Sequence, residues 1–422
     1  MEDSGLRARP NGTLKFEPDL GAGANLSHPP VSESHPAGPI KHGIVVQILR
    51  AVASINFFIA ACMSINIAQL VGAPMYYWRK DYFYAWMALT KQSFALVMLS
   101  LTQWFTPSVF RVSWDPALRG QFKKMPDGRV ETQFPERLVL MANHQIYTEW
   151  IYFWWTAYTS QMAGHLYIML KESLKKLPLL GQGMMFFGFI FMARKWESDK
   201  PRIEHRLKQL CTRRNGPTSG TSQYDPMWLL IFPEGTNLSA NTRRKSVAWS
   251  EKSGKRDLKH CLLPRATGMY FCLQQLRGTV EWVYDCTVGY EGVPASGYAQ
   301  DYFTLRSTFL QGRPPVSVNM YWQRYAIQEI PLDTLEAFQD WIENIWREKD
   351  DLLDQYKSTG RFPADTTDMS TSGEKEPGYI ETKIKLRSIT ELGQISVVAV
   401  TLALIANIVV RLLQQFSILA RD

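Results

Sequence analysis

Cysteine is scarce in this sequence and follows no pattern that would fix a fold. Its 422 residues include five cysteines, and their spacing shows none of the close pairs that metal sites use. A closed disulfide framework also requires an even number. We therefore exclude a disulfide scaffold and a cysteine metal site, and we expect reduced thiols, no bound metal and no resident cofactor.

Long runs of one charge are also absent. Lysine and arginine outnumber aspartate and glutamate by 47 to 39, but the net charge of +8 is spread along the chain. A dispersed excess of this size is typical of a solvated surface, and no nucleic-acid-binding module accompanies it. We expect no nucleic-acid partner. An anionic partner with phosphate groups fits the charge better.

The beginning of the chain lacks the apolar core of a signal peptide. Residues 1–42 are rich in proline, glycine and serine and contain few aliphatic side chains. Such a segment buries too little apolar surface to offset the entropy lost on ordering. We predict a disordered tail over residues 1–42, with any membrane segment acting as its own anchor.

Apolar and aromatic residues are abundant after this tail. Residues 51–74 carry no charged side chain and are long enough to cross the hydrocarbon of a bilayer. An aromatic and basic segment, MYYWRK, follows them, as is common where a helix leaves a membrane. Residues 94–105 form a shorter run, which favours a partly buried or re-entrant helix. We assign residues 43–110 to membrane-anchoring helices.

The middle of the chain, residues 111–357, alternates short apolar runs with amphipathic stretches, which predicts an α/β domain. The expected strands are 138–142, 187–193, 228–232, 280–288 and 316–322. The expected helices are 149–158, 202–211, 268–277 and 335–356. A polar linker at 358–380 leads to a last segment, 381–422, in which the apolar run 395–410 predicts a membrane-associated or transmembrane helix.

The strongest local pattern is LVLMANHQIYTEW, an apolar strand that runs into His144 and then Glu149. On one regular helix these two residues would lie about 140° apart and could not meet. If His144 lies in the turn, however, Glu149 in the first turn of the next helix can reach back to the imidazole. That arrangement predicts a general base and the carboxylate that orients it.

A second strand ends in a similar way, with the sequence WLLIFPEGTNLS. Ligands bind at the carboxyl ends of strands in α/β sheets. Gly235 permits a close approach of the backbone, and Glu234 and Thr236 offer an acceptor and a donor to a polyol or phosphate. An ordinary turn would explain this segment if it stood alone.

Four segments together resemble the motifs of the glycerolipid acyltransferases, the lysophosphatidic-acid acyltransferase superfamily. The first and third are carried by Asn143, His144, Glu149, Phe232, Pro233, Glu234, Gly235 and Thr236. The segment GFIFMAR is similar to the second motif, in which Gly188 and Arg194 would lie beside the acceptor phosphate. The segment LLPRATG is similar to the fourth motif, which would place Pro264 near the path of the acyl chain or CoA. The resemblance extends over residues 51–356.

The block KESLKKLPLLGQGM, which begins at Lys171, resembles the branch that contains lysocardiolipin and lysophosphatidylinositol acyltransferases. Two positions depart from the family pattern. Glu149 stands where the family has aspartate, and the extra methylene displaces the carboxylate by about 1.5 Å in a site that tolerates about 0.5 Å. Asn237 stands where many relatives have arginine. The expected substitutes are Arg243, Arg244 and Lys245.

The resemblance implies an integral membrane O-acyltransferase of phospholipid synthesis or remodelling. Acyl-CoA would be a co-substrate, and the acceptor a lysophospholipid of the lysophosphatidic acid, lysophosphatidylinositol or lysocardiolipin class. His144 and Glu149 would be catalytic. The substrate-binding residues would be Lys171, Gly188, Arg194, Glu234, Gly235, Thr236 and Pro264. A serine nucleophile is disfavoured because the sequence has no Gly-x-Ser-x-Gly elbow.

Two alternatives stay open at this point. One is a transacylase that uses the same His144 and Glu149 without CoA. The other is a lipid-binding relative in which Glu149 has weakened catalysis. The resemblance also implies the endoplasmic reticulum membrane, with the active site facing the cytosol. Association with mitochondria or lipid droplets is the alternative.

Overall fold

Buried strands with apolar side chains on both faces form the centre of the α/β domain. The computed structural model describes residues 35–215, 222–294, 296–363 and 379–419. Within them, eight strands form one mixed sheet in the order β12-β1-β11-β10-β4-β9-β5-β6. Their bounds are β1 Val109–Trp114, β4 Arg137–Ala142, β5 Leu166–Lys171, β6 Ile190–Met192, β9 Met227–Ile231, β10 Trp282–Tyr290, β11 Ser317–Ala326 and β12 Ile380–Lys383.

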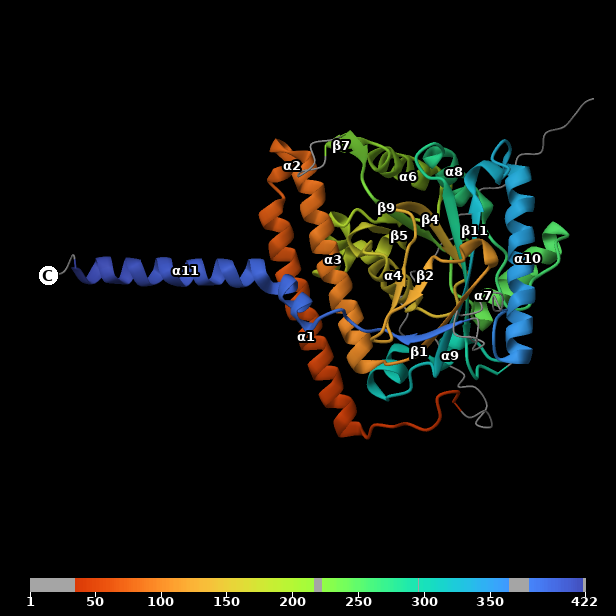
Figure 1. The fold of residues 1–422 in the computed structure, drawn as a ribbon, viewed down its shortest axis with the longest axis horizontal. Coiled ribbons are helices and arrows are strands. Elements are labelled where there is room, and N and C mark those ends of the chain that lie inside the picture. The colour runs from red at the N-terminus through yellow and green to blue at the C-terminus, as the bar shows by residue number, and fades with distance from the viewer. Residues whose placement is uncertain (1–34, 216–221, 295, 364–378, 420–422) are drawn as a thin grey trace, which may run out of the picture. The chain divides into compact units, whose positions relative to one another are not determined.

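Alternate side chains of these strands enter two apolar layers. In β4, Leu138 and Leu140 face one layer, while Val139 and Met141 face the other. Because both faces are covered, the strands are apolar throughout, as parallel strands usually are. Figure 1 shows helices on both sides of the sheet. On the first side lie α3 Lys80–Phe105 and α4 Glu149–Thr159, and on the second α6 Trp196–Leu210, α8 Ala266–Leu276 and α10 Leu335–Thr359.

The strands from β10 to β6 run parallel to one another, whereas β11 is antiparallel to β10. This direction places the carboxyl ends of β4, β9, β5 and β6 at one edge of the sheet. The short elements that follow these strands are α5 Leu180–Phe186 and α7 Ala240–Ser253. Two further antiparallel strand pairs lie outside this sheet, β2 Phe122–Lys124 with β3 Val130–Thr132 and β7 Arg213–Asn215 with β8 Ser222–Tyr224. The short helix α9 spans Ala299–Tyr302.

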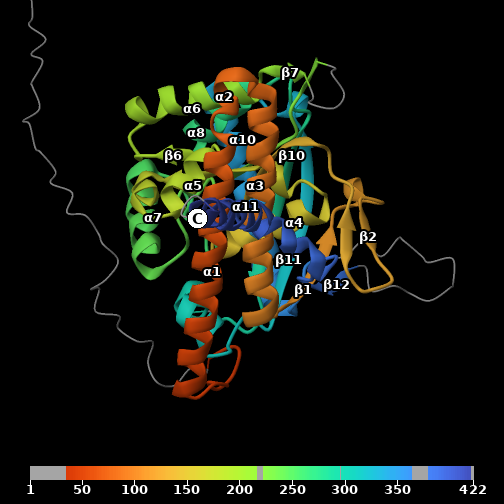
Figure 2. The ribbon, with the colours of Figure 1, turned by 90° about the vertical axis from the view of Figure 1, so that its left-hand side faces the viewer.

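Two helical stretches are long and apolar enough to cross a membrane, at Ile44–Trp78 and Ile389–Gln414. The first contains α1 Ile44–Gly72 and the short α2 Met75–Trp78, and the second contains most of α11 Gly393–Leu419. Figure 2 shows α1 beside α3. The prediction for residues 94–105 was too short. These residues are the second half of α3, and their side chains are mostly buried against the α/β core.

Three other predictions need correction. The strand expected at 187–193 is limited to β6, because Gly188 adopts a φ of 74° and breaks the extended backbone. The segment 381–422, predicted as a membrane-associated helix, begins instead with the strand β12, which pairs antiparallel with β1 and extends the sheet. Residues 35–42 contact the domain, where the His35 ring is 3.0 Å from the backbone oxygen of Tyr302. Residues 1–34 and 364–378 lie outside the described part of the chain.

Candidate active site

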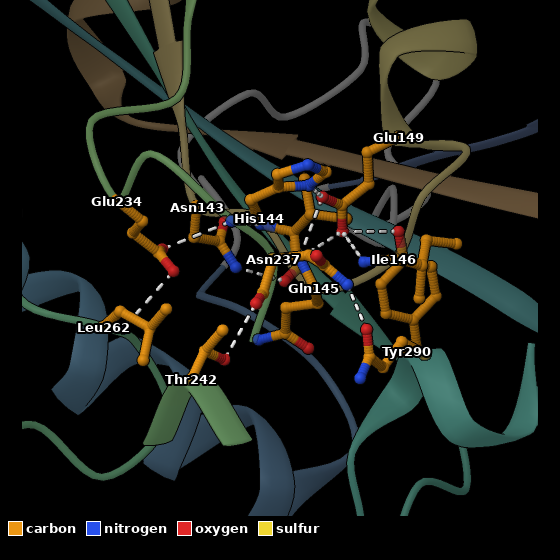
Figure 3. A network of polar contacts seen from close by, with 12 residues as sticks. Asn143, His144, Gln145, Ile146, Glu149, Glu234, Asn237, Thr242, Leu262 and Tyr290 are labelled. Atoms are coloured by element: carbon orange, nitrogen blue, oxygen red, sulfur yellow. Dashed lines mark hydrogen bonds and ion pairs between the residues drawn. The ribbon is translucent and has the colours of Figure 1, made fainter. Parts of the chain in front are cut away.

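Two neighbouring strands end side by side and supply the central residues of the site. Because β4 and β9 are parallel and in register at Met141 and Ile231, the turns that follow them meet at the same edge. His144 lies in the turn after β4, and Glu234 lies in the turn after β9. Figure 3 shows both turns and the residues that join them.

His144 and Glu149 form the predicted pair. The Nδ1 atom of His144 lies 2.7 Å from Oε2 of Glu149, which is the first residue of α4. The Glu149 side chain is completely buried, whereas the imidazole is 18% exposed. Since Nδ1 is engaged by the carboxylate, Nε2 is the ring nitrogen available to accept a proton. The geometry is that of a histidine base held by a buried carboxylate.

Further donors converge on the Glu149 carboxylate. The backbone N–H groups of Gln145 and Ile146 donate to it at 2.9 to 3.2 Å. The hydroxyl of Tyr290, at the end of β10, donates to Oε1 at 2.8 Å. The turn thus closes around the longer side chain of glutamate and holds it against the imidazole (Figure 3). Tyr290 was not predicted from the sequence.

The imidazole of His144 is also held from its face and through its backbone. Its ring stacks on Phe232, with centroids 4.3 Å apart and an interplanar angle of 23°. Its carbonyl accepts a bond from the N–H of Leu238 at 2.8 Å. The preceding residue, Asn143, exchanges two bonds with the backbone of Val288 and ties the turn to β10. His144 therefore has little freedom to rotate.

The structure gives Glu234 a different place from the predicted one. Its side chain is buried and accepts bonds from the N–H groups of His144 at 3.2 Å and Leu262 at 3.3 Å. Burial raises the pKa of this carboxyl to about 8, although both backbone bonds oppose the shift. Glu234 joins the His144 turn to the LLPRATG segment and does not face outward to a substrate.

Two arginines flank the exposed Gly235. The guanidinium of Arg194 donates to the Gly235 carbonyl at 3.1 Å, from a residue whose φ is 66°. On the other side, an atom added at the Cβ position of Gly235 would lie 3.4 Å from the Arg265 side chain. Partial burial and then the charge of Arg265 lower the pKa of Arg194. The pair provides concentrated positive charge at the edge where His144 lies, as phosphate binding requires.

The other predicted residues lie around this edge with unequal exposure. Lys171 is exposed at the carboxyl end of β5, opposite Met192 of β6. Thr236 is half-buried and Pro264 is buried. Gly188 lies at the opposite end of β6 from Arg194, so it does not belong to this cluster. Its φ of 74° explains why glycine occupies the position.

The structure also shows which residues could replace the arginine that many relatives carry at position 237. Asn237 is buried and bonded to Gln300. Arg243 is held by Asp257 and by the carbonyls of Leu258 and Lys259, so its guanidinium is already engaged. Arg265 is better placed to supply the missing charge. Its position in LLPRATG was the only signal in the sequence that could have identified it.

The chain is similar to known acyltransferases. The Acyltransferase family matches residues 128–291, and the Acyltransferase C-terminus family matches residues 308–389. The chain is 35% identical to an uncharacterized acyltransferase of Schizosaccharomyces pombe, over 75% of this chain and 87% of that protein. It is 33% identical to a 2-acyl-1-lysophosphatidylinositol acyltransferase of Saccharomyces cerevisiae, over 77% and 88%. It is also 33% identical to lysocardiolipin acyltransferase 1 of Gallus gallus, over 54% and 55%.

The chain belongs to the glycerolipid acyltransferase family, and it is an O-acyltransferase.

Proposed function

We propose that the protein transfers a fatty acyl group from acyl-CoA to the hydroxyl of a lysophospholipid. The observation that carries the proposal is the 2.7 Å contact between His144 and the buried Glu149. Nε2 of His144 removes the proton from the acceptor hydroxyl as its oxygen attacks the thioester carbonyl. Collapse of the tetrahedral intermediate forms the ester and releases CoA, whose sulfur takes the proton back from the imidazolium.

The cations near His144 support an acceptor with a phosphate group. Arg194 and Arg265 flank Gly235, and Lys171 ends the neighbouring strand β5. Relatives named for lysophosphatidylinositol, lysocardiolipin and 1-acylglycerol-3-phosphate acylation all act on lysolipids that carry phosphate. The two apolar helical stretches fit an enzyme held at a membrane, and we propose the endoplasmic reticulum, with the site facing cytosolic acyl-CoA.

The test is an acyl-transfer assay with the purified full chain in detergent. The protein is incubated with an acyl-CoA and a panel of lysophospholipids, and products are identified by mass spectrometry while released CoA is measured. His144→Ala is expected to lower the rate by about 10²- to 10⁴-fold. His42→Ala, which removes a histidine far along the chain from these motifs, is the control. Undiminished CoA release by His144→Ala would refute the mechanism, and product formed equally without acyl-CoA would indicate a transacylase.

A second variant tests whether glutamate at position 149 weakens the enzyme. The four donors around Glu149 fit its present length. Glu149→Asp withdraws the carboxylate by about 1.5 Å, which separates it from both His144 and Tyr290. We expect Glu149→Asp to be slower than the natural protein. If the natural protein is inert and Glu149→Asp is active, the protein is instead a lipid-binding relative in which Glu149 has weakened catalysis.

A further inference from the structure

A second cavity lies between α2, α3, α5, β6 and α6, apart from the His144 site. Its volume is about 570 Å³, a size typical of ligand pockets. We call it the basic aromatic pocket and define it by Tyr76, Phe83, Lys175, Arg202, His205 and Arg206. Among the described residues that line it, none is aspartate or glutamate, and none is His144, Glu149 or Arg194.

Arg206 is the most deeply placed cation of the pocket. Its guanidinium donates to the Gln209 side chain, and no carboxylate of the described residues lies within ion-pair distance. Space for it is provided by Gly188, where an added Cβ would lie 1.8 Å from Nη2 of Arg206. Burial lowers the pKa of Arg206, which reflects the cost of holding its charge there.

A buried lysine lies behind the pocket wall. Lys91 of α3 is 2% exposed, and its Nζ lies 3.5 Å from the ring centroid of Tyr167 and 5.8 Å from that of Phe189, a lining residue. The charges of Lys91 and Arg206 are close enough to repel. Like Arg206, Lys91 has no carboxylate partner in the described parts of the chain. Buried charges without a counter-ion are costly, and a bound anion would reduce that cost.

The rim of the pocket has too few carboxylates to neutralise it. Glu172 lies 2.7 Å from Arg202 and 3.8 Å from Lys175, and Asp199 lies 4.0 Å from Arg202, so the rim has two acidic groups. With Arg206, three cations face these two carboxylates around the cavity. Guanidinium groups bind phosphate oxygens through paired hydrogen bonds. The pocket therefore has the chemistry of a phosphate site.

The position of the pocket indicates where the phosphate comes from. Tyr76 belongs to α2, at the end of the apolar stretch Ile44–Trp78. The next two side chains, Tyr77 and Trp78, are 87% and 79% exposed. Tyrosine and tryptophan at the end of an apolar helix lie at the depth of lipid headgroups. Figures 1 and 2 both show α2 and α6 at the same end of the α/β domain.

We propose that the basic aromatic pocket binds the phosphate-bearing headgroup of an anionic membrane lipid, at a site separate from the acyl-transfer centre. Arg206 and Arg202 contact the phosphate, Lys175 adds charge at the rim, and the rings of Tyr76 and Phe83 contact the glycerol and upper acyl chains. This binding goes beyond the proposed function, because it requires neither His144 nor acyl-CoA.

The test measures lipid binding by the full chain in neutral detergent, using native mass spectrometry. The probes are dioctanoyl phosphatidylglycerol, dioctanoyl phosphatidylcholine and inorganic phosphate. We expect phosphatidylglycerol to bind best and Arg206→Gln to weaken it about tenfold, as the loss of one charge-assisted contact implies. Lys208→Gln removes a charge from the exposed side of α6 and is the matched control. Lys175→Gln, at the rim, gives a smaller loss and serves if Arg206→Gln does not fold.

Equal binding of phosphatidylglycerol by the natural protein, Arg206→Gln and Lys175→Gln would overturn the proposal. So would displacement of the lipid by inorganic phosphate at equal concentration, which would identify a free-phosphate site. Displacement by coenzyme A would assign the pocket to the acyl donor instead. His144→Ala is expected to keep the binding, so failure of the proposed acyl transfer and failure of this site give different results.

Discussion

The carboxylate of Glu149 is buried beside the His144 imidazole, and among the described residues no arginine or lysine lies within ion-pair distance of it. It is stabilised instead by hydrogen bonds from its own turn and from Tyr290. Bonds of this kind hold the carboxylate in place. The Glu149 carboxylate can then stabilise the imidazolium that forms when His144 takes a proton. The hydroxyl of Tyr290 is the one side-chain donor in this set besides His144.

Tyr290→Phe removes that donor and leaves the ring. We expect kcat to fall about tenfold with little change in KM, since a hydrogen bond to a charged group contributes about 1.5–3 kcal/mol and this one acts through Glu149. Tyr325→Phe is the matched control, because the buried Tyr325 hydroxyl has no partner in the described structure. Steady-state kinetics on both variants make the comparison. An equal fall in kcat for Tyr290→Phe and Tyr325→Phe would contradict a positioning role. So would a change in Tyr290→Phe that is confined to KM.

Glu234 makes stability depend on pH in a particular direction. Its pKa is raised from 4.5 to about 8 by burial. Between these values the folded chain keeps a proton that the unfolded chain releases, so stability falls as pH rises toward 8 and changes no further above it. Glu234→Gln cannot ionise. We expect the Tm of the natural protein to fall between pH 5.5 and 8 by a few degrees more than that of Glu234→Gln.

The measurement is differential scanning fluorimetry in matched detergent buffers. Glu329→Gln, which removes an exposed carboxylate, should follow the natural protein at each pH. Parallel Tm curves for Glu234→Gln and the natural protein would mean that Glu234 is ionised in the folded state. The two backbone bonds from His144 and Leu262 would then outweigh the cost of its burial.

Spacing along the chain pairs only residues that are close in sequence. His144 and Glu149 are five positions apart, and the turn geometry follows from their spacing. Tyr290 lies 141 positions from Glu149 and meets it only because β10 pairs with β4. The contacts of Glu234 could not be predicted for a related reason. The Leu262 N–H that donates to its second oxygen comes from a distant segment that local pattern does not place.

At the scale of elements, the parallel strands decide where the site lies. The turns after β4 and β9 hold His144 and Glu234, and the turn after β6 holds Arg194. The Arg194 turn is fixed by the helix that follows it. Asp199, buried in the first turn of α6, accepts bonds from the N–H groups of Ala193 at 2.7 Å and Lys195 at 3.1 Å.

Asp199→Ala leaves these two amides without their acceptor and frees the Arg194 turn. We expect KM for the lysophospholipid to rise about tenfold with a smaller change in kcat, because Arg194 is proposed to bind phosphate and not to transfer protons. Glu197→Ala, in the same turn of α6 but exposed, should leave both constants unchanged. Steady-state kinetics at saturating acyl-CoA separate the effect on KM for the lysophospholipid from the effect on kcat. An equal loss of kcat in Asp199→Ala would indicate a general structural defect.

Elements were predictable where pattern and length agreed. The apolar runs at β4 and β9, and the amphipathic pattern of α10, gave bounds close to those observed. β6 was overextended because an apolar sequence does not reveal the positive φ at Gly188. β12 was not predicted, because a strand of four residues after a polar linker is too short to show a recognisable alternation of apolar and polar side chains. Its pairing with β1 is set by tertiary contacts.

For the whole molecule, the two apolar helical stretches occupy opposite ends of the chain, and the α/β domain lies between them in sequence. The C-terminal stretch is joined to the domain by a segment that packs on it. Ile384 and Leu386 are buried in the same apolar layer as α3 and α4, and the Arg387 guanidinium donates to the Tyr158 carbonyl at 2.5 Å. The segment 379–392 is therefore part of the α/β domain.

Two truncations test this assignment. A chain ended after residue 397 keeps β12 and the packed segment, and it loses side chains that are exposed along α11. A chain ended after residue 363 also loses Ile380, Ile384 and Leu386 from the core. Each buried aliphatic side chain contributes about 1.5–3 kcal/mol, so the shorter chain should melt on the order of 10 °C lower. The longer one should keep the natural Tm.

Fluorimetry in detergent gives both Tm values, and membrane sedimentation provides an independent measurement. Since both truncated chains retain Ile44–Trp78, both should still sediment with membranes if this stretch alone is a sufficient anchor. Equal Tm values for the two truncations would show that β12 adds nothing to the sheet. Loss of the shorter chain from the membrane fraction, with an unchanged Tm, would instead assign the packed segment to membrane attachment. A lower Tm with sedimentation unchanged is the result that the pairing of β12 with β1 requires.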